Sequence, residues 1–210
     1  MISLNLETLT DSGKILFPKL AAFGDVFYLA GGTALALQLG HRVSIDFDLF
    51  SLNPIKKTLL AKVEDKLAEE SVTPMVATSR ELSVMVKGVK CTFLHYPFQV
   101  RHPFFTLTPI PILSAKELLV TKAYTIGRRG SLKDYVDLWA GIEASVATLP
   151  EILELAGQKY TDAFNDRLFL EQLLYLDDVA DETLLMLARV QPSKSELSNF
   201  FSELIQQLSV

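Results

Sequence analysis

The chain has 210 residues, 49% of them apolar, and a formal net charge of −5. This composition excludes an intrinsically disordered chain, and no apolar run approaches the roughly 18 residues of a membrane-spanning helix. The acidic balance disfavours a protein that grips nucleic acid over a broad basic surface, so a nucleic-acid substrate would have to use a local basic patch. The first residues lack the basic and apolar regions of a signal peptide, and we expect a cytoplasmic protein with no membrane partner.

The first half of the chain alternates short apolar runs with helix signals. These patterns predict, in chain order, a helix capped by Asp11 or Ser12, a buried strand, a helix, a half-buried strand and a helix, over residues 9–22, 26–30, 33–39, 44–50 and 53–70. Three more apolar runs predict strands over residues 72–78, 82–86 and 89–96. Because Lys87-Gly88 separates the last two, they are expected to form a hairpin.

The second half of the chain begins with a connector rich in proline, between residues 97 and 111. Beyond it we predict only helices, near residues 115–128, 132–143, 150–159, 163–176, 182–189 and 194–208. Capping-box spacings at Ser114, Ser131 and Ser193 mark three of their starts. The order predicts an α+β fold, with one domain over residues 1–112 and a helical region over residues 113–210.

The one cysteine, Cys91, lies in an apolar run. A single cysteine cannot form an internal disulfide, which suits a reducing compartment. We expect a buried structural thiol rather than a nucleophile.

Two aspartates, Asp46 and Asp48, carry the main chemical signal. Residues two apart on a strand point to the same face, so the two carboxylates would lie side by side and repel each other unless a cation separates them. Mg²⁺ prefers oxygen ligands and usually takes one or two carboxylates together with substrate phosphates. Phe47 and Leu49 would point the other way, into the core. The pattern therefore predicts a metal site on a rigid strand.

The Gly31-Gly32 pair, followed by Thr33, precedes this strand. A strand that ends in two glycines and opens a helix leaves backbone N–H groups free at the helix start, where the helix dipole favours an anion. Thr33 would add a hydroxyl donor. The turn is therefore expected to hold a triphosphate whose metal is held by the aspartates.

Each half of this pattern also has a structural interpretation. Two glycines before a helix are mostly just a turn, and Asp-x-Asp is most often a solvated strand face. Ser44 shares the face of Asp46 and would either contact a phosphate or serve as an ordinary edge-strand hydroxyl, which we favour slightly. It is the combination, on a strand, turn, helix and strand, that points to nucleotide chemistry.

A second group of charges follows the connector. Lys122 and Arg129 are seven residues apart and share a helix face, and both are suitable phosphate ligands. Lys133 and Asp137 are four apart and would pair on the helix surface. The alternative is a solvated helical junction held together by ion pairs, including Asp134.

The residues from Leu29 to Phe50 resemble the first motif of the AbiEii/AbiGii toxin-type nucleotidyltransferases, which belong to the DNA polymerase β-like superfamily. Lys122, Arg129-Gly130 and the run from Lys133 to Leu138 resemble the downstream lysine and Arg-Gly-x-x-Lys-Asp-x-x-Asp-Leu signature of this family. The run from Gly88 to Pro97 is similar to the strand between them. The resemblance covers roughly residues 25–140.

The resemblance implies a minimal nucleotidyltransferase core, a mixed sheet flanked by helices, with a C-terminal helical lobe that completes the active-site cleft. It implies that Gly31, Gly32 and Thr33 contact the triphosphate, that Asp46 and Asp48 bind one or two Mg²⁺ ions, and that Lys122 contacts phosphate while Asp134 supports catalysis. Beside these, the residues themselves make Ser44, Arg129 and Lys133 further candidates for nucleotide contacts. Many superfamily members place a third carboxylate on the later core strand, where this chain has Thr92.

The expected activity is Mg²⁺-dependent transfer of a nucleotide from an NTP to an acceptor hydroxyl. By family analogy the acceptor would be RNA, such as tRNA, and the chain would be the toxin of a toxin–antitoxin or abortive-infection system with a cognate antitoxin as partner. The alternative, favoured by the missing third carboxylate, is a weakly active or inactive module that binds a nucleotide or a partner on the same fold.

Overall fold

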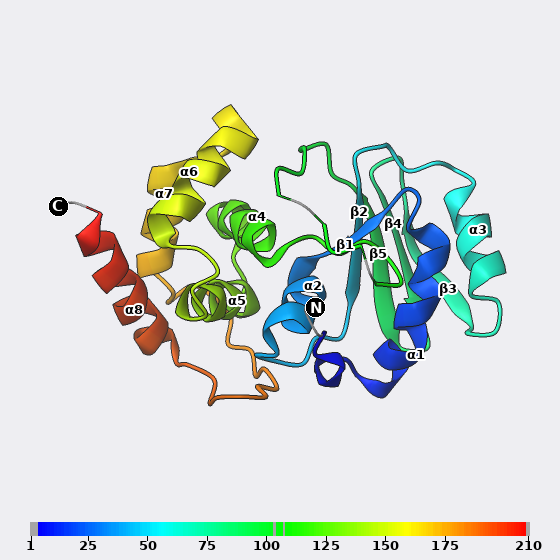
Figure 1. The fold of residues 1–210 in the computed structure, drawn as a ribbon, viewed down its shortest axis with the longest axis horizontal. Coiled ribbons are helices and arrows are strands. Elements are labelled where there is room, and N and C mark those ends of the chain that lie inside the picture. The colour runs from blue at the N-terminus through cyan, green and yellow to red at the C-terminus, as the bar shows by residue number, and fades with distance from the viewer. Residues whose placement is uncertain (1–3, 103, 107, 209–210) are drawn as a thin grey trace. The chain divides into compact units, whose positions relative to one another are not determined.

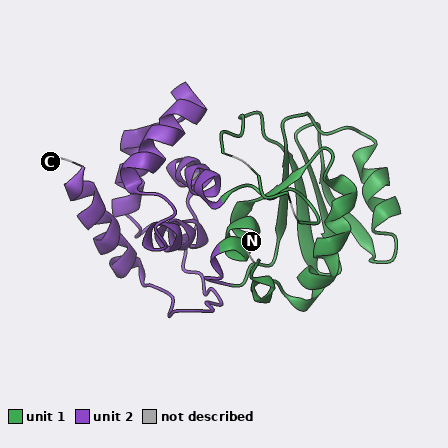
Figure 2. Cartoon of the chain, viewed as in Figure 1, with its two compact units in different colours: residues 1–38, 43–114 green, residues 39–42, 115–210 purple. Residues whose placement is uncertain are grey.

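The computed structural model describes residues 4–102, 104–106 and 108–208. The chain divides into two compact units (Figure 2). Unit 1 comprises Met1–Gln38 and Val43–Ser114, and unit 2 comprises Leu39–Arg42 and Ala115–Val210. The short segment before Val43 thus belongs to the helical unit, although its neighbours on both sides in the sequence belong to unit 1.

Unit 1 is built on a five-stranded mixed sheet with the order β1-β2-β5-β4-β3 (Figure 1). Strands β2 and β5 run parallel, and the other three pairings are antiparallel. The strands span Tyr28–Ala30, Phe47–Ser51, Val72–Ala77, Glu81–Val86 and Val89–His95 for β1 to β5. The predicted α+β class with a mixed sheet is confirmed.

Helices flank both faces of the sheet. Helices α1 and α3 lie on one side in Figure 1 and α2 on the other. The apolar face of the sheet packs against α1 and the 3₁₀ helix that follows it. Phe17 of α1 packs on Phe47, and Phe23 of the 3₁₀ helix packs on Phe93. The helical elements of this unit are η1 Leu6–Thr8, α1 Asp11–Lys19, η2 Leu20–Phe23, α2 Gly31–Leu39 and α3 Leu59–Lys66.

The predicted hairpin is confirmed and its turn explains its register. Strands β4 and β5 are antiparallel partners around Lys87 and Gly88, whose φ angles are 52° and 79°. Two successive residues with positive φ form the type of tight turn that matches the twist of paired strands. The register that follows sets Ser83 opposite Thr92.

Several predicted boundaries in unit 1 are wrong. Helix α1 is capped by Thr10, whose side chain accepts the N–H of Gly13, rather than by Asp11 or Ser12. Helix α3 begins at Leu59 instead of near residue 53, because the backbone N–H of Ile55 donates to the carbonyl of Ser79 and holds that segment outside a helix. Strand β2 begins at Phe47.

Unit 2 consists of helices, most of them where the sequence predicts them. The capping boxes predicted at Ser131 and Ser193 are present at the starts of α5 and α8, and Thr148 with Glu151 forms another at α6. The helices are α4 Ala115–Arg129, α5 Leu132–Glu143, α6 Leu149–Tyr160, η3 Thr161–Ala163, α7 Asp166–Leu174 and α8 Lys194–Gln207.

The helix predicted near residues 182–189 is wrong. This segment is irregular and forms an antiparallel bridge between Met186 and Arg42, with the N–H of Leu187 donating to the carbonyl of His41. A backbone partner from a distant part of the chain has replaced the helical hydrogen bonds that the local sequence favours.

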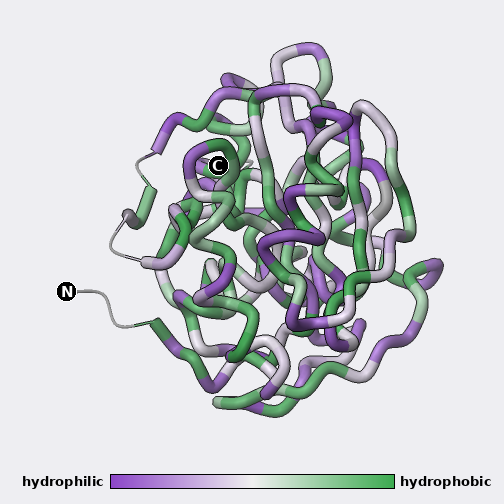
Figure 3. The backbone as a smooth tube through the Cα atoms, turned by 90° about the vertical axis from the view of Figure 1, so that its right-hand side faces the viewer, coloured by the Kyte–Doolittle hydropathy of each residue, from purple (hydrophilic) through white to green (hydrophobic). Residues whose placement is uncertain are grey.

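Hydrophobic and hydrophilic stretches alternate along the trace (Figure 3). Accordingly, none of the helices in the described part of the chain is both long and apolar enough to cross a bilayer.

Candidate active site

The glycine turn lies directly against an aspartate. Strand β1 ends at Ala30, and α2 begins at Gly31, whose φ is +66°. A Cβ atom at Gly31 would lie 2.1 Å from Oδ2 of Asp48, so no other residue fits there without displacing the carboxylate. Since Ala30 is the cross-strand partner of Asp48, the register of β1 and β2 produces this approach. The carboxylate of Asp48 therefore lies directly beside the start of α2.

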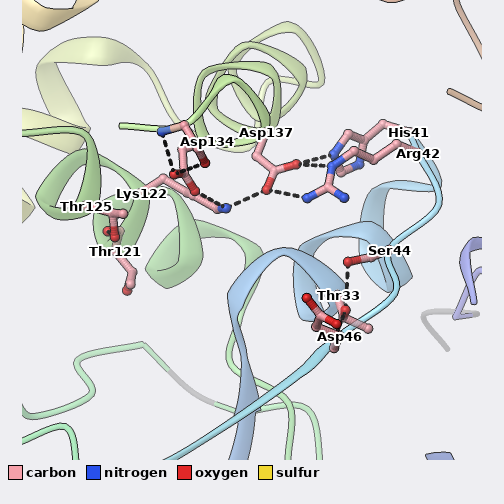
Figure 4. Close-up of polar contacts among 11 residues, drawn as sticks. Thr33, His41, Arg42, Ser44, Asp46, Thr121, Lys122, Thr125, Asp134 and Asp137 are labelled. Carbon is pink, nitrogen blue, oxygen red and sulfur yellow. Dashed lines mark hydrogen bonds and ion pairs between the residues drawn. The ribbon is translucent and has the colours of Figure 1, made fainter. Parts of the chain in front are cut away.

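Thr33 and Ser44 hold the segment that leads into the acidic strand. The Thr33 hydroxyl donates to the backbone carbonyl of Asp46, and Oγ of Ser44 lies 2.8 Å from Oγ1 of Thr33 (Figure 4). Thr33 itself is buried. Within unit 1 the two predicted nucleotide ligands Thr33 and Ser44 thus contact each other.

The acidic pair has an apolar back. Phe47 and Leu49 are fully buried, whereas Asp46, just before β2, and Asp48, on β2, are half-buried. Burial, together with the nearby negative charges of these two carboxylates, raises the pKa of the Cys91 thiol to about 12. The predicted buried structural thiol is confirmed.

Thr92 lies beside Asp48. The two are register partners in the parallel pairing of β2 with β5. No group of three or more His, Cys, Asp or Glu side chains with metal-binding geometry occurs among the described residues. At this point of the sheet the structure thus offers the carboxylates of Asp46 and Asp48 and, beside Asp48, the hydroxyl of Thr92.

A second cluster, around Asp137, lies in unit 2 and consists of buried side chains (Figure 4). The Asp137 carboxylate accepts Nε of Arg42 at 2.7 Å and Nη2 at 2.9 Å, and lies 2.8 Å from Nε2 of His41. On its other side Nζ of Lys122 approaches to 2.6 Å. Asp137 is 0% exposed, so these contacts replace its solvation entirely.

Lys122 is shared between two carboxylates. Its Nζ lies 2.7 Å from Oδ1 of Asp134 as well as 2.6 Å from Asp137. The other oxygen of Asp134 accepts the hydroxyl and the N–H of Ser131, which caps α5. Asp134 thus caps the start of α5 and also holds the side chain of Lys122 on α4.

The pKa values of this group follow from its partners. Burial alone would raise the pKa of Asp137, but Lys122, Arg42 and His41 hold it well below its ordinary range. Burial likewise opposes the charge of Lys122, yet Asp137 and Asp134 keep its pKa raised. The cluster is therefore ionised and internally neutralised.

Two sequence interpretations of this region are wrong. Asp137 does not pair with Lys133 on the helix surface, because Asp137 is buried against Arg42 and Lys122. Nor do Lys122 and Asp134 lie in a solvated junction, since both are buried. Lys133 is half-exposed, and the side chain of Arg129 lies outside the described residues.

His41 and Arg42 are the residues that the sequence did not connect to this group. They are separated from Asp137 by 96 and 95 positions. No periodicity or capping signal reaches that far, so the sequence offered no signal that would have joined them to Asp137. By contrast, the hairpin turn fixed the pairing of Ser83 with Thr92, and its register could have been counted from the sequence.

Solved structures share this fold. JHP933 of Helicobacter pylori has a TM-score of 0.59 at 15% identity, covering 99% of this chain and 95% of that one. MenT4, the nucleotidyltransferase toxin Rv2826c of Mycobacterium tuberculosis H37Rv, has a TM-score of 0.57 at 17% identity, covering 90% and 80%. The two structures therefore share the overall fold of this chain, and one of them is a nucleotidyltransferase toxin.

Part of the sequence of unit 1 matches a known family. Residues 14–100 match the family described as nucleotidyl transferase AbiEii toxin, Type IV TA system. This match to a part of unit 1 confirms the predicted resemblance to that family and the predicted class of enzyme, a nucleotidyltransferase. The uncharacterized protein aq_aa25 of Aquifex aeolicus (strain VF5) is 29% identical over 185 residues, 86% of this chain and 87% of that protein.

Proposed function

We propose that this chain is a divalent-metal-dependent nucleotidyltransferase that moves a nucleotide from an NTP to a hydroxyl of an RNA acceptor, with tRNA as the first candidate. One observation carries the proposal: the carboxylate of Asp48 lies against Gly31 at the first turn of α2. A metal-binding group and an anion-binding helix start are thereby combined at one point.

The residues present fit Mg²⁺ as the cation. Two half-buried carboxylates, Asp46 and Asp48, match the one or two that Mg²⁺ usually takes before substrate phosphates complete its shell. When bound there, the ion would neutralise the phosphate charge that develops during transfer.

The chain's own groups would position the triphosphate. The first N–H groups of a helix have no partner within it, so those of Gly31 and Gly32 are available to phosphate oxygens. Thr33 and Ser44 contact each other and would act by fixing the backbone that carries Asp46. Such positioning is most of what nucleotidyl transfer requires.

The helical unit supplies the remaining proposed roles. Lys122 is expected from the resemblance to contact phosphate, but its Nζ lies 2.7 Å from Asp134 and 2.6 Å from Asp137, so we propose that Lys122 and Asp134 serve by holding α4 and α5 together within unit 2. Arg129 and Lys133, with the exposed Arg128, are proposed to contact nucleotide or RNA phosphates. Because the matching family is one of toxin–antitoxin systems, we propose a cognate antitoxin as the partner.

A binding module without turnover is the second candidate. It is favoured by Thr92, which stands beside Asp48 where many superfamily members have a third carboxylate. Such a module would bind NTP with the same groups and release it unchanged.

A transfer assay separates these candidates. Purified protein is incubated with each α-³²P-labelled NTP, total tRNA and Mg²⁺, and label in RNA is measured on a gel. Transfer that disappears with EDTA and in the Asp46→Ala variant supports the enzyme. Binding of NTP in a filter assay, without label in RNA or protein, supports the module; label in protein alone would replace the RNA acceptor with a protein side chain.

A further inference from the structure

A row of polar side chains extends across the sheet of unit 1 from Asp48. Parallel register sets Asp48 beside Thr92 of β5, and antiparallel register sets Thr92 beside Ser83 of β4. Laterally paired residues of a sheet point to the same face. The three side chains therefore share one face, and Glu81, two residues before Ser83, shares it as well.

This face is the more open one. Glu81, Asp48 and Thr92 are half-buried, whereas the alternating residues of the same strands, such as Leu82 and Phe93, are buried. Polar groups on the half-open face of a nucleotidyltransferase sheet, next to a proposed metal ligand, are placed where a substrate can reach them.

Hydrogen bonds connect the far end of the row. The Ser83 hydroxyl donates to Oε1 of Glu81 at 2.6 Å and lies 3.4 Å from Oγ1 of Thr92. A hydroxyl has one proton, so the short bond to Glu81 leaves the lone pairs of Ser83 for the Thr92 hydroxyl. The longer contact is of the kind that tightens when substrate binds. The direction of donation is then Thr92 to Ser83 to Glu81.

Ser83 has no other evident use on this face. It is 0% exposed, and a buried hydroxyl costs free energy unless it is hydrogen-bonded. A chain that only had to fill this space would place an apolar residue there. The hydroxyl instead links a carboxylate to the position beside Asp48.

We propose that Thr92, Ser83 and Glu81 form a relay that takes the proton of the acceptor hydroxyl, in place of a third carboxylate beside the metal ligands. The inference rests on the proposed function. As the acceptor oxygen bonds to the α-phosphorus, its proton passes to Thr92, the Thr92 proton to Ser83 and the Ser83 proton to Glu81, which becomes neutral. The bond between the α-phosphorus and its bridging oxygen breaks, and pyrophosphate leaves with the electron pair.

In this arrangement Thr92 touches the reacting hydroxyl, while Ser83 and Glu81 are positioning residues that act through it. Their removal should lower kcat and leave the KM for NTP unchanged, since neither contacts the nucleotide. A purely structural role would move KM and stability along with kcat.

The test measures kcat and KM for NTP with α-³²P-labelled NTP, Mg²⁺ and saturating total tRNA. Glu81→Gln keeps the shape of the side chain but cannot take the proton, and we expect kcat to fall by about a hundredfold or more, the usual contribution of general-base catalysis. Glu64→Gln makes the same chemical change on exposed α3 and should keep the wild-type kcat.

Ser83→Ala and the double variant complete the experiment. Since both residues act in one relay, Ser83→Ala should lose as much kcat as Glu81→Gln, and the double variant should be no slower than either. Wild-type kcat in Glu81→Gln, or additive losses, would overturn the relay while the proposed function stands. A wild-type chain that transfers nothing would overturn the proposed function and the relay together.

Discussion

Each unit of this chain holds a pair of neighbouring aspartates, Asp134 and Asp137 in unit 2 and Asp46 and Asp48 in unit 1, and the two pairs are balanced in opposite ways. In unit 2, Asp137 is fully buried and neutralised by Arg42 and Lys122. In unit 1, Asp48 is half-buried and lies against a glycine backbone beside the hydroxyl row of its sheet.

Under the proposed function, the comparison separates structural from functional carboxylates by their environment. A buried carboxylate with its own cations is committed to the fold, because losing a partner leaves an uncompensated charge. Carboxylates on a half-open face next to a helix start can instead be balanced by a cation that arrives with a substrate. Replacing each carboxylate by its amide tests this division.

The largest expected effect is on stability, from Asp137→Asn. The change leaves Arg42 and Lys122 without their shared anion, and we expect the free energy of unfolding to fall by about 3–5 kcal/mol. Urea unfolding followed by fluorescence measures it, because the one tryptophan, Trp139, lies on α5 in the same unit. Asp178→Asn, at an exposed position, is the control. Equal stability of the two variants would contradict the structural role.

Asp48→Asn should lower activity and leave stability nearly unchanged. Loss of a direct metal ligand should lower transfer by at least about a hundredfold, since even residues behind the ligands commonly cost 10- to 100-fold. The free energy of unfolding should change by no more than about 0.5 kcal/mol, as is usual for a residue outside the buried core. The transfer assay and urea unfolding of the same sample check both. A variant that unfolds readily and keeps its activity would reverse the assignment.

Gly31→Ala sharpens the comparison within unit 1. The added Cβ must displace the Asp48 carboxylate, which it would approach to 2.1 Å, so transfer should fall with stability. Gly88→Ala is the matched control: its φ is also positive, at +79°, but nothing lies within 4 Å. It should lose only the roughly 1–2 kcal/mol of left-handed strain and keep its activity. Equal activities would mean that the contact with Asp48 is unimportant.

The smallest expected effect is the acid response of unit 2. Because the pKa of Asp137 in the folded chain lies well below its ordinary value of 3.8, its contribution to stability is present above that value and is lost as the pH falls through the folded pKa. Below about pH 4 the free energy of unfolding should fall by up to about 1.4 kcal/mol per pH unit for this group.

Trp139 fluorescence in urea between neutral and acid pH measures this slope. Asp137→Asn should have a shallower slope than wild type, because the amide does not titrate. Asp134, whose pKa is also lowered by Lys122 against the effect of burial, should retain its share. Identical slopes would show that Asp137 does not control the acid stability.

The sequence by itself determined the local elements of this protein. The hairpin followed from Lys87-Gly88, the starts of α5 and α8 from capping boxes, and the glycine turn from the sudden end of an apolar run. These signals join residues at most four apart, so they act in the same way whatever the rest of the chain does. The family resemblance also rested on such a continuous run, Leu29 to Phe50.

Only the tertiary structure decided which charges meet. It bound Asp137 to Arg42 across 95 positions, and it paired Met186 with Arg42 where a helix was predicted. It also held Ile55 to Ser79 and so delayed the start of α3. Partners so far apart are chosen by how packed elements satisfy buried polar groups, a condition that does not exist until the chain has folded.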